Sequence, residues 1–168
     1  MVTIERLTQP LMDAVKSVQL ADEQVKFAGT AEEFLQDVTE TTHLHVIKLD
    51  DDVVGFFKLD IAYSDNYEFC PTTALGLRAF ALDKRQQGKG LGTAAVKALF
   101  PYLKEYYGSF EFIYLTVNLK NPGAIACYQK GGFEKTEELY LGGAAGPQHI
   151  MRGRLRAKDK NTNNHQHI

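Results

Sequence analysis

The sequence predicts an α+β fold, in which helices flank a mixed, mostly antiparallel sheet of about six to seven strands. Short apolar or alternating runs typical of strands recur along the chain. Two of these runs, at residues 77–82 and 113–117, are each followed by a stretch with apolar side chains at helical spacing. A length of 168 residues suits one domain, which we expect to cover residues 1–157.

The chain begins with a predicted strand and two predicted short helices. Residues 2–7 alternate apolar and polar side chains, as a half-buried strand does. Thr8 can cap a helix. The apolar face of that helix would include Leu11, Val15, Val18 and Leu20. Thr30 and Glu33 form a capping box ahead of a second short helix.

A hairpin is predicted next, with strands at residues 43–49 and 53–61 joined by three consecutive aspartates. His43 and His45 lie two residues apart, so they share one side of their strand. A metal site needs a third ligand, which the sequence does not identify, so we take both as ordinary edge or surface histidines and expect no metal. Residues 62–71 form a polar loop.

Residues 77–82 form an apolar run typical of a buried strand, and an amphipathic helix follows the sequence QGKGLG at residues 87–92. Three closely spaced glycines at a helix start are costly, which indicates that a large group approaches the backbone there. The unpaired N–H groups and the positive dipole end of a helix favour a phosphate or pyrophosphate. Pro101 should kink or end this helix near Phe100, unless its ring falls in a fresh turn.

Two common phosphate-binding loops do not match this segment. The P-loop pattern GxxxxGK[ST] fails because Gly90 follows Lys89, and the dinucleotide pattern GxGxxG has no register here. The pattern that fits is Q-x-x-G-x-G, at Gln87, Gly90 and Gly92. It resembles the coenzyme A loop of the GNAT N-acetyltransferase superfamily. The alternative is a flexible turn whose glycines only permit tight packing.

A second motif strengthens the resemblance. From Leu115 the chain has the sequence LTVNLKNPGAIACYQKGGF, which resembles the family pattern L-x-V-x-x-x-N-x-x-A-x-x-x-Y-x-x-x-G-F at every fixed place. Asn121 is a strong helix N-cap, Pro122 suits the first helical position, and Gly131 can end the helix. Together the two motifs extend the resemblance over residues 72–135.

The remaining chain supplies the last part of the sheet. We expect a strand at residues 133–141, a flexible connection at 142–147 and a final strand at 149–155. Residues 158–168 are polar, with no apolar period, and we expect this tail to be disordered.

The resemblance implies that acetyl-CoA is the cosubstrate and that it enters where the sheet splays, near Leu82 and Val117. Backbone N–H groups of the glycine loop would hold its pyrophosphate. That loop comprises Gln87, Gly88, Lys89, Gly90, Leu91, Gly92 and Thr93. The strand residues Phe80, Ala81 and Leu82 would pair with the pantetheine arm. Lys89 would add a charge or simply be solvated, and Asn121 would reach the cofactor or only cap its helix.

The resemblance also implies that Tyr128 is the general acid that protonates the coenzyme A thiolate, since a phenol is a plausible proton donor. The alternative is a core aromatic side chain. Gly76 stands where some family members carry a glutamate general base. The remaining candidates for the base are Asp60, Glu68 or a water molecule.

The acceptor is expected to be a small-molecule primary amine that attacks the thioester directly. Residues 50–68 contain six acids and one base, which would attract a cationic amine such as a polyamine if part of the group lines the acceptor cleft. The segment LRAFALDKRQQGKGLG is loosely similar to the polyamine-acetylating branch. The alternative for the acidic residues is a solubilising surface. The alternative acceptors are a protein or peptide amine and an aminoglycoside or amino-acid amine. The alternative functions are a non-catalytic regulatory module that binds acetyl-CoA and a purely structural protein.

The overall composition excludes other classes of partner. A net charge of −2 is not the basic surplus of a nucleic-acid-binding protein, and no apolar stretch reaches the length of a membrane span. Two cysteines do not make a disulfide framework, so we expect a reducing, cytoplasmic location. Homodimers are a common expectation for such folds.

Overall fold

The computed structural model describes residues 1–156 and shows seven strands. They are β1 (Val2–Arg6), β2 (Thr42–Leu49), β3 (Asp52–Asp60), β4 (Ala74–Leu82), β5 (Phe112–Asn118), β6 (Glu134–Tyr140) and β7 (Gln148–Arg154). The α-helices are α1 (Met12–Lys16), α2 (Asp22–Ala28), α3 (Ala31–Gln36), α4 (Tyr63–Asn66), α5 (Leu91–Tyr106) and α6 (Pro122–Gly131). Two 3-10 helices, η1 (Gln9–Leu11) and η2 (Lys84–Gln86), complete the elements.

The strands form one sheet in the order β1-β2-β3-β4-β5-β7-β6. Only β4 and β5 pair in parallel, and every other neighbouring pair is antiparallel. The prediction of a mixed, mostly antiparallel sheet flanked by helices is therefore confirmed. The predicted tail at residues 158–168 and the domain end at 157 lie outside the described residues.

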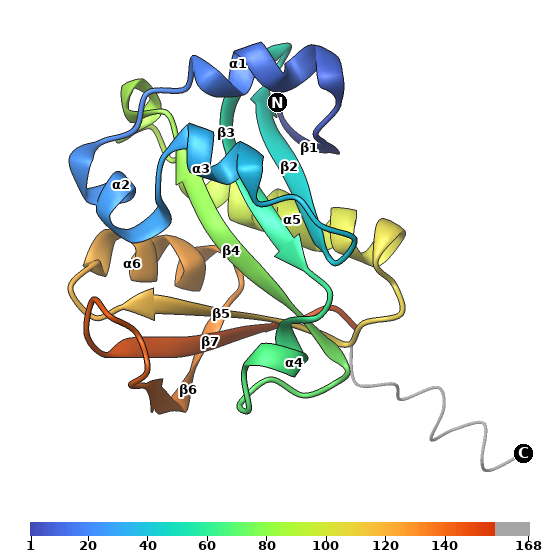
Figure 1. The fold of residues 1–168 in the computed structure, drawn as a ribbon, viewed down its shortest axis with the longest axis vertical. Coiled ribbons are helices and arrows are strands. Elements are labelled where there is room, and N and C mark those ends of the chain that lie inside the picture. The colour runs from blue at the N-terminus through green and yellow to red at the C-terminus, as the bar shows by residue number, and fades with distance from the viewer. Residues whose placement is uncertain (157–168) are drawn as a thin grey trace, which may run out of the picture.

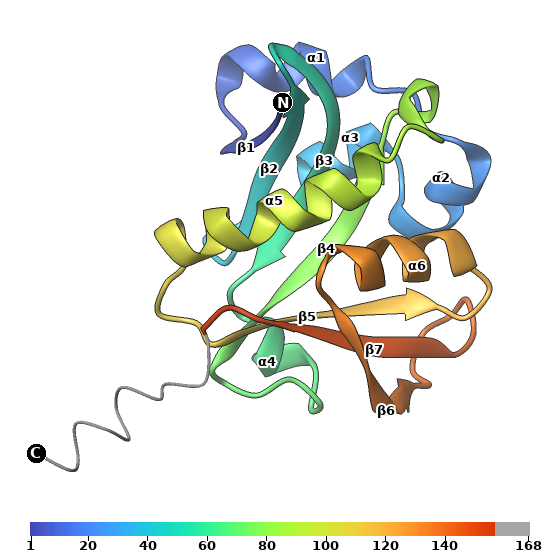
Figure 2. The same cartoon turned by 180° about the vertical axis from the view of Figure 1, so that it is seen from behind.

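Helices cover both faces of the sheet (Figures 1 and 2). The face under α5 and α6 carries the main core, in which Leu99, Ile113 and Met151 have no exposed surface. On the opposite face α1 and α3 cover a smaller core, where the rings of Phe34 and Phe56 stack with centroids 4.2 Å apart. The sheet is therefore buried on both sides around its centre.

The N-terminal helix is shorter than predicted. It ends at Lys16, Thr8 makes no side-chain cap, and an unpredicted helix, α2, follows. The chain leaves the helix because Gln19 is tied to the segment after β4: its N–H donates to Asp83 Oδ2 at 3.2 Å, and its carbonyl accepts from Lys84 N at 2.6 Å. Tertiary contacts thus override the apolar period of this stretch.

The helix does not end near Phe100, which was one of the two predicted outcomes. Instead, α5 runs through Pro101 to Tyr106. Pro101 is exposed, and so is Lys97, whose carbonyl loses its helical partner at this proline. Water can therefore satisfy that carbonyl, while Leu99 and Leu103 keep the other face of the helix buried. The predicted polar loop after β3 also contains a short helix, α4.

The prediction of two edge or surface histidines is wrong for His45, which is wholly buried. Its Nδ1 lies 3.0 Å from the His43 carbonyl, which can only accept, so Nδ1 carries the proton. Its Nε2 then accepts from the Tyr102 hydroxyl at 2.8 Å, and its ring stacks on Phe57. The histidine is held neutral between the sheet and α5.

Burial lowers the pKa of His45 to about 4 from its ordinary 6.5. Since the folded pKa is the lower one, the stabilising contribution is present above pH 6.5 and is lost as the pH falls towards 4. We expect the free energy of unfolding to fall by about 2 kcal/mol between pH 7 and pH 5 from this group. Urea unfolding across this range tests the prediction, and the His45→Gln variant should show a flatter pH dependence. Equal pH slopes in the two proteins would contradict it.

Candidate functional site

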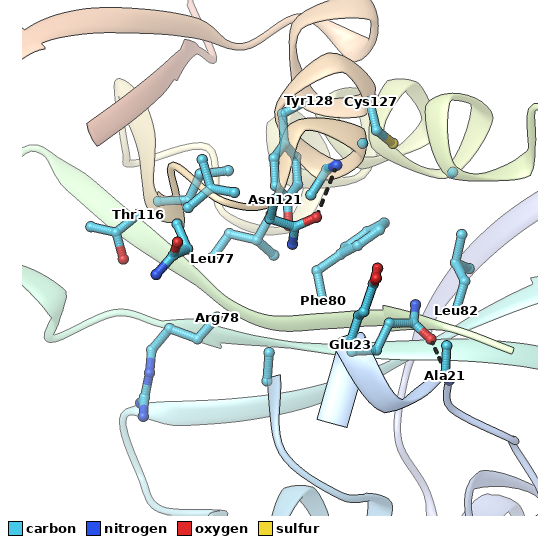
Figure 3. A pocket seen from close by; sticks show the side chains of 18 of the residues that line it. Ala21, Glu23, Leu77, Arg78, Phe80, Leu82, Thr116, Asn121, Cys127 and Tyr128 are labelled. Carbon is cyan, nitrogen blue, oxygen red and sulfur yellow. Dashed lines mark hydrogen bonds between the residues drawn. The ribbon is translucent and has the colours of Figure 1, made fainter. Parts of the chain in front are cut away.

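The sheet opens between its two parallel strands. β4 and β5 pair only through Ala74–Gly76 and Phe112–Tyr114, and beyond this point they diverge. A cavity of about 690 Å³ occupies the opening and is lined by β4, β5, α2, α4, α6 and the loop before α5 (Figure 3). We call it the β4–β5 cavity. The predicted parting of the strands near Leu82 and Val117 is confirmed.

A bulge shapes the β4 wall of the β4–β5 cavity. Phe56 pairs with Ala81 and Lys58 pairs with Arg78, so two β4 residues stand opposite one residue of β3. Ala79, inside the bulge, has a φ of 53°, which is rare for a residue other than glycine and costs of the order of 1 kcal/mol or more. A bulge leaves main-chain groups without a partner on the neighbouring strand. This part of β4 can therefore offer hydrogen bonds to a ligand.

The entry to the glycine loop is held by Asp83. Its carboxylate accepts from the main-chain N–H of Arg85 at 2.9 Å, from the guanidinium at 2.6 Å, and from Gln19 N. These bonds, chiefly the one from the Arg85 side chain, lower the pKa of Asp83 to about 2. The carboxylate is thus ionised at neutral pH and fixes the chain direction after β4.

The glycine loop leaves the start of α5 open. Gly88 and Gly90 have φ values of 80° and 74°, a region that favours glycine, and Gly90 caps α5 without any side-chain hydrogen bond. A side chain at Gly92 would meet the Cys127 Sγ at 2.9 Å, so this glycine lets α5 approach α6. No side chain caps the first N–H groups of this sixteen-residue helix, and unpaired groups at such a position favour an anion.

Tyr128 faces the β4–β5 cavity from α6. The helix begins at Asn121, whose side chain accepts from Ala124 N at 3.4 Å, with Pro122 at its first position. The half-buried ring of Tyr128 lies edge-on to Phe80, with centroids 5.8 Å apart (Figure 3). Desolvation raises the pKa of Tyr128 above its ordinary value. Its hydroxyl is therefore protonated at neutral pH and is available as a donor.

Ten of the twelve predicted site residues line the β4–β5 cavity. They are Phe80, Leu82, Gln87, Gly88, Gly90, Leu91, Gly92, Thr93, Asn121 and Tyr128. The side chain of Ala81 instead packs on the opposite face of the sheet, and Lys89 is an exposed side chain outside the lining. Ala81 can therefore contribute only its main chain.

Neither acid considered as a general base lines the β4–β5 cavity. Asp60 is buried, accepts from Ala62 N at 2.9 Å and pairs with Arg78, while Glu68 is exposed elsewhere. At Gly76 a Cβ would overlap the ring of Tyr63. The tyrosine ring thus fills the space that a side chain at position 76 would need.

The sequence missed several residues that line the β4–β5 cavity, among them Glu23, Tyr63, Tyr67, Arg78 and Thr116. No local pattern marks them, because short helices and a bulge bring them to the opening. The six acids counted between residues 50 and 68 are all absent from the lining. Asp50, for example, pairs with the N-terminal amino group at 3.0 Å. They therefore do not supply a negative acceptor cleft.

No helix in residues 1–156 is long and apolar enough to cross a membrane. No cluster of three or more histidine, cysteine, aspartate or glutamate side chains in the same range is arranged to hold a metal ion.

Comparison with known proteins agrees with this geometry. Residues 9–133 match the family described as "Acetyltransferase (GNAT) family". The spermine/spermidine N(1)-acetyltransferase of Bacillus subtilis (strain 168) is 29% identical over 144 residues, which cover 84% of this chain and 93% of that protein.

Solved structures share the fold. Aminoglycoside acetyltransferase AAC(6')-Ib in complex with coenzyme A has a TM-score of 0.75 at 23% identity, covering 92% of this chain and 95% of that chain. The ribosomal-protein-S18-alanine N-acetyltransferase from Escherichia coli has a TM-score of 0.67 at 20% identity, covering 96% and 98%. At these identities the likeness is one of fold alone.

Proposed function

The chain belongs to the acetyltransferase (GNAT) family, and on that premise we propose that it moves the acetyl group of acetyl-CoA to a primary amine of a small molecule. The observation that carries this proposal is the β4–β5 cavity. It joins the glycine-capped start of α5, the bulged strand β4 and Tyr128 in one opening. The cosubstrate supplies the activated acyl group as a thioester.

The residues of the β4–β5 cavity suit a long cofactor with a charged end. Main-chain N–H groups of residues 87–93 would hold the pyrophosphate at the positive end of α5. Main-chain groups of Phe80–Leu82 would pair with the amides of the pantetheine arm, as an added strand does. Asn121 lines the same opening, although its side-chain oxygen is already engaged with Ala124 N. We therefore assign Asn121 chiefly to capping α6.

In the proposed reaction the amine nitrogen attacks the thioester carbonyl carbon, a C–N bond forms and the C–S bond breaks. Tyr128 gives its hydroxyl proton to the departing thiolate. Its raised pKa keeps the proton in place until that step, and its edge-on contact with Phe80 orients the ring. The amine must lose one proton, and no acid proposed from the sequence lines the β4–β5 cavity. We propose that water carries this proton to bulk solvent and that a proton from solvent restores the Tyr128 hydroxyl.

A polyamine is the acceptor that we favour. The support is the 29% identity to a spermine/spermidine N(1)-acetyltransferase over most of both chains. The fold neighbours include enzymes named for aminoglycosides and for a ribosomal protein, so fold alone does not choose among acceptors. A protein or peptide amine is the second candidate, and a non-catalytic acetyl-CoA-binding module is the third.

Two measurements test the proposal. Acetyl-CoA at about one hundred times its Kd should raise the free energy of unfolding by about 2.7 kcal/mol. Thiol release from acetyl-CoA should then depend on an added amine, and spermidine should be among the best acceptors. Stabilisation without release would identify a binding module, and release only with peptide amines would identify a protein acetyltransferase. Absence of both effects would overturn the assignment of the β4–β5 cavity.

A further inference from the structure

The side of the β4–β5 cavity opposite α6 is built by α2 and α4 and bears one carboxylate. Among the described residues that line the cavity, Glu23 on α2 is the only acid, and the cations are Lys26 and Arg78. The Glu23 side chain is exposed and is drawn beside Phe80 among the lining residues in Figure 3. The lining therefore offers a single anionic point to an acceptor.

The Glu23 carboxylate is not engaged within the protein. No hydrogen bond or ion pair joins it to another residue of the described part of the chain, residues 1–156. Arg78, in contrast, is shared between two carboxylates, with contacts of 3.4 Å to Asp37 and 3.4 Å to Asp60. The second of these acids is buried, so the Arg78 charge is balanced beside the cavity. Glu23 is thus the lining acid that can take a cationic partner.

Tyr67, backed by the buried ring of Tyr63, supplies an aromatic wall of the same cavity. The rings of Tyr63 and Tyr67 stack with centroids 4.4 Å apart, and both residues line the opening. Tyr63 occupies the space left by Gly76, so this wall is aromatic where a charged side chain would otherwise stand. A methylene chain packs favourably on such a surface. Within the one cavity, the wall suits an alkyl chain and the carboxylate suits an ammonium group at its end.

We propose that Glu23 binds the distal ammonium group of a diamine or polyamine, while the reacting amine lies in the same cavity on the side of Tyr128. This inference rests on the proposed function, and it makes Glu23 a residue that determines specificity. A second positive charge would thereby be recognised in the acceptor. An alkyl monoamine of the same length would gain nothing from this residue.

The test compares two acceptors that differ only in the distal charge, 1,6-diaminohexane and hexylamine. Glu23→Gln should lower kcat/KM for the diamine by about threefold to fivefold, the upper part of the range of an ion pair at an exposed site. It should change kcat/KM for hexylamine and the KM for acetyl-CoA by less than about twofold. Asp22→Asn is the matched control, because it removes a neighbouring exposed charge outside the lining. It should leave both acceptors unaffected.

Glu23→Lys supplies the reverse test, because it should raise kcat/KM for 6-aminohexanoate relative to kcat/KM for the diamine. Calorimetric binding of 1,6-diaminohexane to the protein saturated with coenzyme A tests Glu23 without any turnover. Weaker binding by the Glu23→Gln variant than by Asp22→Asn supports the inference even if thiol release fails. The inference would be overturned if the two variants bound the diamine equally, or if Glu23→Gln lowered kcat/KM equally for the diamine and for hexylamine. Either result would leave the proposal of acetyl transfer in place.

Discussion

Replacing Tyr128 with phenylalanine should lower kcat by about 10²- to 10³-fold and leave the KM for acetyl-CoA within about twofold. The variant keeps the ring, so its edge contacts with Phe80 and Phe133 and the shape of the β4–β5 cavity are preserved. Only the hydroxyl that would protonate the thiolate is lost. The thiolate must then leave with its charge or wait for a proton from water.

Steady-state kinetics with acetyl-CoA and the best acceptor measure this effect. Tyr106→Phe is the control, because Tyr106 is 64% exposed and lies outside the β4–β5 cavity. It should retain full activity. The melting temperatures of both variants should stay near that of the parent, since neither loses a core contact. A Tyr128→Phe enzyme with unchanged kcat would leave that hydroxyl without a part in proton transfer.

Local rules predicted the parts of the fold that depend on near neighbours in the chain. The Thr30 and Glu33 capping box forms as expected, with Glu33 N donating to the Thr30 hydroxyl at 3.1 Å. Asn121 caps α6, and Gly90 caps α5 in the left-handed conformation. Each of these features is decided by residues within about four positions, so the sequence alone was sufficient.

Features that depend on distant segments were not predicted. His45 is buried because α5 brings Tyr102 over it from fifty-seven positions away, which no strand pattern reveals. Ala79 adopts a positive φ only because β3 and β4 pair with an extra residue between them. Glu23 and Tyr63 reach the β4–β5 cavity on short helices whose positions are fixed by tertiary contacts. The glycine loop and Tyr128 could therefore be predicted to share one site, whereas the cavity residues on α2 and α4 could not be predicted.

The acceptor side yields the prediction with the largest expected effect on stability. Gly76→Ala should lower the free energy of unfolding by about 2–3 kcal/mol, because its Cβ would overlap the ring of Tyr63. Gly76 pairs with Asp60 on one side and Tyr114 on the other, so the strand cannot easily move away. The Tyr63 ring is only 2% exposed and cannot swing into solvent without leaving its pocket.

Urea unfolding measures the stability lost in the Gly76→Ala variant, and Gly123→Ala is the matched control. Apart from neighbouring backbone of the same helix, no atom of the described residues lies within 4 Å of the position that a Cβ would take at Gly123, so alanine there should be neutral or stabilising in α6. A double-mutant cycle with Tyr63→Ala should show that the two positions are coupled, since the smaller side chain at 63 makes room for the methyl group. Two results would show that the Tyr63 ring does not fill the space beside Gly76. One is additive effects of Gly76→Ala and Tyr63→Ala, and the other is equal stabilities of the Gly76→Ala and Gly123→Ala variants. If the coupling is found, a glutamate cannot be introduced at position 76 without removing the aromatic wall proposed to receive the acceptor chain.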